Sequence, residues 1–164
     1  MDTTPEGPRI VVGVDGSEPS ILALRLAAQL APALEARVHA VSCWDFPPLF
    51  AGYLPPDFYT FEGKATKILH EALEKAFGAE PPPGMTTALE RGPAPATLVK
   101  AGADAQMLIV GRRGHGGIRG MHLGSVSTAC VAHAPCPVLV VHEETKPKPP
   151  RRPRPKRQAE LYVH

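Results

Sequence analysis

Two kinds of apolar spacing alternate along the chain from residue 9 to residue 142. Short, nearly continuous apolar runs predict buried strands at residues 9–15, 37–44, 85–90, 106–110 and 137–142. Apolar side chains three or four residues apart predict helices at residues 17–34, 61–77, 94–103 and 125–134. This alternation is typical of an α/β domain whose parallel sheet is covered by helices on both faces.

The helical spacing also predicts which side chains the first two helices bury. In the first helix these are Ile21, Leu24, Ala28 and Ala31, and Pro32 is expected to kink or end that helix. In the second helix they are Ile68, Leu69, Ala72, Leu73 and Ala76.

A glycine-rich segment, GRRGHGGIRGMHLGS, joins the predicted strand at 106–110 to the predicted helix at 125–134. Its glycines at 111, 114 and 124 are separated by two and by nine residues, and Ser125 follows the last. Glycines between a strand and a helix let backbone N–H groups approach a phosphate that side chains would block. The segment therefore predicts nucleotide binding.

A second candidate, Asp15, follows the first predicted strand. In a doubly wound sheet, ligands bind at the carboxyl ends of the strands where the winding reverses. If the first and fourth strands are neighbours there, Asp15 and the segment Gly111–Gly114 open onto the same crevice.

These segments resemble the ATP-binding branch of the universal stress protein family. The resemblance is carried by VVGVDGS at 11–17, LIVGRRGHGGIRGMHLGSVS at 108–127 and APCPVLVV at 134–141. It implies a doubly wound five-stranded parallel sheet of strand order 3-2-1-4-5, of the adenine nucleotide alpha hydrolase-like type. It also implies a domain at residues 1–142 that binds ATP and regulates a stress response.

The family's contacts, carried over by position, assign roles to several of these residues. Asp15 would lie against the ribose or against the phosphates and their Mg²⁺, although Asp15 and Ser17 are also good helix caps. The glycines at 111 and 114 would approach the ribose and phosphates, and residues 124–127 would receive the terminal phosphates. The predicted nucleotide-binding set is Val14, Asp15, Gly16, Ser17, Val41, Cys43, Val110, Gly111, Arg112, Arg113, Gly114, Gly124, Ser125, Val126 and Ser127.

Within this set, the backbone of Cys43 would contact adenine, while Val41 is more typical of ordinary core. Arg112 and Arg113 replace the family's usual small polar residue followed by Arg or His. Two guanidinium groups would strengthen phosphate binding, although an Arg112 that points to solvent is equally compatible with the sequence. Arg119 and His122 could close over the phosphates or be exposed.

Catalysis has little support in the sequence. No lysine follows Gly124, as a P-loop would require, and no G-x-S-x-G elbow occurs. We therefore expect no catalytic residues, and ATP that is bound and released or at most hydrolysed slowly. Cys130 and His133 could share a zinc ion on one helix, but no second pair has ligand spacing.

Charge divides the chain at residue 142. Residues 143–164 hold seven Lys and Arg and three Glu, a net +4, while residues 1–142 hold 11 cations and 13 acids, a net −2. This Pro-rich extension is expected to be disordered, as a solvated end or as a contact for nucleic acid, acidic lipid or an acidic partner. The three cysteines without a CxxC pair, and the lack of a signal peptide or membrane span, predict a cytoplasmic protein.

The last strand, PVLVVH at 137–142, is expected at a sheet edge, where an apolar strand is a liability unless it is paired. The resemblance implies a homodimer formed through this strand. Two alternatives to ATP binding remain: binding of AMP or a cyclic nucleotide by the same fold, and an adaptor role of the basic extension.

Overall fold

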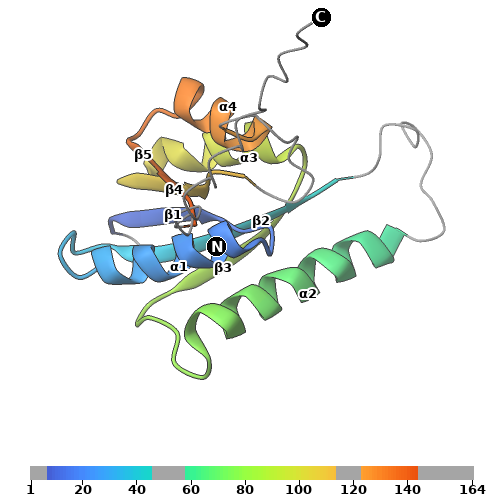
Figure 1. The fold of residues 1–164 in the computed structure, drawn as a ribbon, viewed down its shortest axis with the longest axis horizontal. Coiled ribbons are helices and arrows are strands. Elements are labelled where there is room, and N and C mark those ends of the chain that lie inside the picture. Colours follow the sequence, from blue (N-terminus) through green and yellow to red (C-terminus); the bar gives the residue numbers. More distant parts are fainter. Residues whose placement is uncertain (1–6, 46–57, 114–122, 144–164) are drawn as a thin grey trace, which may run out of the picture.

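The computed structural model describes residues 7–45, 58–113 and 123–143. Its elements, labelled in Figure 1, are β1 (Arg9–Gly13), α1 (Glu18–Leu30), β2 (Arg37–Trp44), α2 (Phe58–Phe77), β3 (Thr86–Arg91), α3 (Ala94–Ala101), a 3₁₀ turn (Gly102–Asp104), β4 (Met107–Gly111), α4 (Ser125–His133) and β5 (Val138–Val141). Each predicted strand and helix is present, with ends that differ by a few residues.

The five strands form one parallel sheet in the order β3-β2-β1-β4-β5, which confirms the predicted fold class. Helices α1 and α2 lie on one side of the sheet, and α3 and α4 lie on the other (Figure 1). The chain steps outward from β1 to β2 to β3 and then crosses to β4 and β5. The winding therefore reverses between β1 and β4.

Two buried clusters fill the space between the sheet and its helices. Successive residues of a strand point to opposite faces, so Ile10 and Val12 pack toward α1 and α2 while Val11 packs toward α3 and α4. All three are 0% exposed. The strands read as continuous apolar runs because both faces of β1 are covered.

The helix faces differ in detail from the sequence expectation. In α1 the buried apolar positions are Ile21, Ala23, Leu24 and Ala27, whereas Ala28 is only partly buried. The prediction for Ile68 was wrong, because this side chain is 38% exposed. Helix α2 contacts α1 and β2, and its buried contact residues are Ala65, Leu69 and Ala72.

One side chain ties the two helices of that layer together. Arg25 of α1 donates to the backbone carbonyl oxygens of Lys75 at 2.7 Å and of Ala76 at 3.5 Å, in the last turn of α2. A cation at this position stabilises carbonyl groups that have no partner within the helix.

None of the helices within the described ranges combines the length and apolar content that a bilayer crossing needs.

Candidate functional site

The segment after β1 contains the first group of candidate residues. The Val14 N–H donates to the Val41 carbonyl at 2.8 Å, which continues the pairing of β1 with β2 by one residue. Val14 is 4% exposed, whereas Asp15 is exposed. Gly16 then turns the chain with a φ of +81°, a conformation that favours glycine. The carboxylate of Asp15 therefore stands at the carboxyl end of β1 with access to solvent.

A short hydrogen-bond network fixes Asp15 against α1. Its Oδ1 accepts from the Ser17 N–H at 3.0 Å and from the Ser17 hydroxyl at 2.5 Å. The Ser17 hydroxyl oxygen in turn caps α1 by accepting a hydrogen bond from the Ser20 N–H at 3.4 Å. The cap is therefore Ser17, while Asp15 holds the capping residue in place and keeps an exposed carboxylate.

The end of β4, which contains the second group of candidate residues, packs directly against α1. A Cβ atom added to Gly111 would lie 2.8 Å from Pro19 Cβ, 3.1 Å from the Pro19 carbonyl carbon and 3.2 Å from the Ser20 nitrogen. The close approach places the first turn of α1 against the end of β4. The same packing accounts for glycine at 111, and the significance of Pro19 was not evident from the sequence.

The N-terminus of α4 lies against the residue that follows β4. The Gly124 N–H donates to the Arg112 carbonyl at 2.8 Å, and the Arg112 N–H donates to the Val141 carbonyl at 2.6 Å. As N-cap of α4, Gly124 provides no side-chain cap. An added Cβ would meet nothing closer than the Arg112 oxygen at 3.5 Å, and its φ of −77° suits any residue. Neither packing nor backbone strain therefore requires glycine at 124.

Two arginines directly follow β4 and lie beside the start of α4. Arg112 and Arg113 are both partly buried, so neither side chain simply extends into solvent. The Nε atom of Arg113 is buried and has no hydrogen-bond partner. A buried donor without an acceptor costs about 1–3 kcal/mol, and the Nε atom of Arg9, at the start of β1, is in the same state.

The residues predicted near adenine lie on β2, on the side of the sheet covered by α3 and α4. Val41 is 2% exposed and belongs to the buried cluster there, so its side chain is core. Cys43 packs against the same cluster and is partly buried. Burial, reinforced by the charge of Glu90 and opposed by a hydrogen bond with Thr97, raises the pKa of the Cys43 thiol to about 11. This thiol is therefore protonated at neutral pH.

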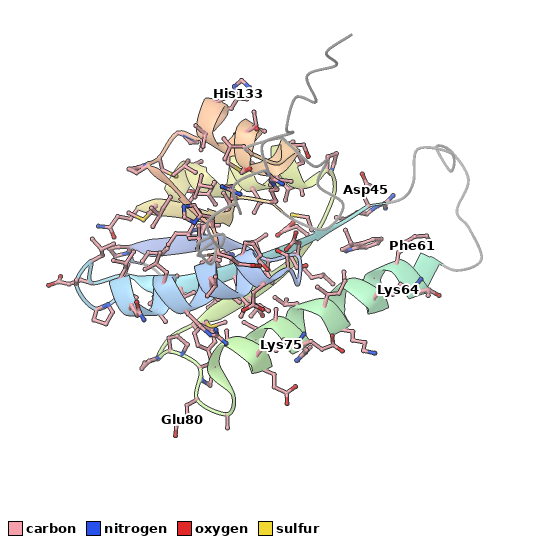
Figure 2. The ribbon with its side chains drawn as sticks, viewed as in Figure 1. Asp45, Phe61, Lys64, Lys75, Glu80 and His133 are labelled. Atoms are coloured by element: carbon pink, nitrogen blue, oxygen red, sulfur yellow. The ribbon has the colours of Figure 1, made fainter. Side chains whose placement is uncertain are left out.

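Some predictions concern positions that the structure does not describe. Gly114, Arg119 and His122 lie outside the described residues. For the zinc alternative, Cys130 is 0% exposed, whereas His133 is exposed at the outer surface of α4 (Figure 2). Across the described ranges, no three His, Cys, Asp or Glu side chains lie close enough together to hold a metal ion.

Comparison with known proteins places this geometry in a family. The Universal stress protein family matches residues 8–142. Universal stress protein Rv2623 of Mycobacterium tuberculosis is 33% identical over 151 residues, covering 85% of this chain and 49% of that protein. Universal stress protein Mb2019 of Mycobacterium bovis is 33% identical over 162 residues, covering 89% of this chain and 50% of that protein. The chain thus spans about half the length of these relatives.

Solved structures agree with the fold. Universal stress protein UspA from Lactobacillus plantarum superposes with a TM-score of 0.65 at 21% identity, covering 82% of this chain and 97% of that one. A universal stress protein in complex with cAMP superposes with a TM-score of 0.51 at 26% identity, covering 82% and 96%. By its sequence match and its sheet topology, the chain belongs to the universal stress protein family.

Proposed function

We propose that this chain binds ATP between the ends of β1 and β4 and acts as a nucleotide-dependent regulator of a stress response. The observation that carries the proposal is the meeting of three segments where the winding reverses: the start of α1 at Pro19 and Ser20, the end of β4 at Gly111 and Arg112, and the start of α4 at Gly124. Ligands of doubly wound folds bind at this position. The uncapped start of α4 at Gly124 is suited to an anion, because its first amides have no partner within the helix.

Two further observations support a ligand with phosphates. Gly124 carries no side chain although the protein has room for one, which leaves the backbone of the α4 start open to close approach. The buried Nε of Arg113 has no partner, and a phosphate oxygen is the acceptor that a guanidinium group prefers. Positive charge from Arg112 and Arg113 would offset the charge of a polyphosphate.

Mg²⁺ would fit this site only as a companion of the phosphates. Asp15 offers an exposed carboxylate of which Ser17 uses one oxygen. Among the described residues, no group of three candidate ligands surrounds it. Mg²⁺ commonly takes one or two carboxylates together with phosphate oxygens and water. Asp15 would then orient the ion, and the phosphates would supply most of the binding.

Binding of a cyclic nucleotide is the second candidate function. It is favoured by the similarity to a universal stress protein whose solved structure is a complex with cAMP. AMP binding belongs to the same alternative, because both ligands lack the terminal phosphates that the α4 start and Arg113 would contact. The number of phosphates that the site prefers therefore separates the two candidates.

Titration calorimetry of the full chain with ATP, ADP, AMP and cAMP, with and without Mg²⁺, tests the proposal. We expect affinity to rise with the number of phosphates and the Asp15→Asn variant to lose the contribution of Mg²⁺. Preference for AMP or cAMP would refute ATP as the ligand. Repeated ATP turnovers that Asp15→Ala abolishes would instead identify an ATPase.

Assembly, location and the basic extension complete the proposal. Strand β5 lies at one edge of the sheet and its four residues are only partly buried, so it can pair with a second copy. We propose a homodimer through residues 137–142 in the cytoplasm.

An adaptor role of residues 143–164 is tested by deleting them, since unchanged partner binding would exclude it.

A further inference from the structure

Two serines at the start of α4 have opposite surroundings. Ser125 is exposed, whereas Ser127 is 1% exposed. The Ser127 hydroxyl lies 2.9 Å from the Arg112 carbonyl oxygen and 3.1 Å from the Gly124 carbonyl oxygen. A hydroxyl has a single proton to donate. That proton is therefore directed to the main chain, and its burial keeps it from a ligand.

The Arg112 carbonyl is where the two ends of the glycine-rich segment meet. It accepts one hydrogen bond from the Gly124 N–H at 2.8 Å and one from the Ser127 hydroxyl. Both donors belong to the start of α4, whereas the acceptor follows β4 directly. The pair of hydrogen bonds therefore determines where α4 begins relative to the end of the sheet.

This placement matters because the start of α4 has no side-chain cap. Backbone amides bind an anion well only when they are already directed at the position that the anion will occupy. A helix start that shifts would lose this alignment. Ser127 is the buried side chain that opposes such a shift.

We propose that Ser127 is a positioning residue of the nucleotide site. Its hydroxyl holds the α4 N-terminus against the end of β4, so that the Ser125 hydroxyl and the amides beside it meet the terminal phosphates. The inference rests on the proposed function. The family resemblance implies that the Ser127 hydroxyl contacts a phosphate directly. We infer instead that this hydroxyl supports the residues that make the contact.

The test compares four variants of the full chain: Ser127→Ala, Ser127→Cys, Ser125→Ala and Thr128→Ala. Cysteine at 127 fills the space of the serine but donates poorly, which separates the hydrogen bond from a cavity. Thr128 is an exposed residue of the same helical turn and serves as the matched control. Affinities for ATP and AMP are measured by calorimetry, and exchange of the Gly124 amide is measured in the ligand-free protein.

We expect both Ser127 variants to bind ATP about three- to tenfold more weakly, as the loss of one hydrogen bond predicts, with little change for AMP. They should also exchange the Gly124 amide faster. Ser125→Ala should weaken ATP binding without changing that exchange, and Thr128→Ala should change neither. A purely structural role of Ser127 would weaken ATP and AMP binding equally.

Three outcomes overturn the inference. Unchanged ATP affinity in both Ser127 variants, or equal losses for ATP and AMP, refutes the positioning role while the proposed function stands. The inference is also refuted if, without ligand, the Gly124 amide exchanges at the same rate in the unchanged protein and in the Ser127 variants. Failure of the unchanged protein to bind any adenine nucleotide refutes the proposed function and, with it, this role.

Discussion

Gly111 and Gly124 belong to the same motif, but packing requires glycine only at 111. The same substitution at both positions, Gly111→Ser and Gly124→Ser, separates packing from ligand access. At 111 the added Cβ would lie 2.8 Å from Pro19 Cβ and 3.1–3.2 Å from backbone atoms of Pro19 and Ser20. Backbone atoms cannot move aside by a rotamer change, so α1 must shift away from the sheet.

Overpacking of this kind costs about 1–3 kcal/mol. At 124 the nearest atom to the added Cβ is 3.5 Å away, the φ of −77° suits serine, and serine is a good N-cap. Gly124→Ser should therefore leave the free energy of unfolding unchanged or raise it by a few tenths of a kcal/mol. Its side chain would, however, cover the amides that the proposed phosphates approach.

Urea unfolding followed by circular dichroism measures the first effect, and ATP titration measures the second. With a urea dependence of about 2 kcal/mol per molar, a loss of about 2 kcal/mol moves the midpoint of Gly111→Ser down by roughly 1 M. Gly124→Ser should keep the midpoint and bind ATP at least tenfold more weakly. Equal midpoints for the two variants would refute the packing argument. Normal ATP binding by Gly124→Ser would refute the proposed approach of phosphate to the α4 start.

Three further predictions follow from single side chains. Arg113→Lys keeps the charge but removes Nε, so calorimetry should show weaker binding of ATP while AMP binding is retained; an equal loss for both ligands would argue against a phosphate contact at Nε. Arg25→Ala removes the donor to the carbonyls of Lys75 and Ala76 and should lower the free energy of unfolding by about 0.5–1.5 kcal/mol, measured by urea unfolding. An unchanged urea midpoint would show that these hydrogen bonds do not stabilise the fold. Because the pKa of Cys43 is raised from 9.0 to about 11 in the folded protein, stability should fall as pH rises from about 9 to 11, where only the unfolded thiol ionises. Cys43→Ala should reduce this fall, and an unaltered pH dependence would exclude Cys43 as its cause.

Much of the fold could be predicted because it depends on local patterns. The apolar runs identified each strand, and the order of strands followed from the family resemblance. The buried side chains of the helices were harder to predict than the strands, because helical spacing alone does not determine how wide the buried face is. Ile68 lies one residue from the buried Leu69, yet it falls beyond the contact of α2 with the rest of the layer.

The sequence provided candidate positions for the site, and the family resemblance provided roles that stay predictions. Sequence spacing identified Gly111 and Gly124, which belong to the motif, and the family resemblance added Ser127. It could not reveal that Pro19 packs against Gly111, because this contact depends on where α1 crosses the end of β4. Nor could it reveal that the Ser127 hydroxyl bonds to Arg112, since a buried serine and a ligand-facing serine look alike in sequence.

The hydrogen bond from the Arg112 N–H to the Val141 carbonyl has a mechanical consequence. Val141 ends β5, which runs parallel to β4, and the basic extension begins at residue 143. A pull on the extension along the strand therefore loads the β4–β5 hydrogen bonds in shear, and the bond to Arg112 bears the load first. Tension on the C-terminal extension is thereby transmitted to Arg112, the residue whose carbonyl also anchors the start of α4.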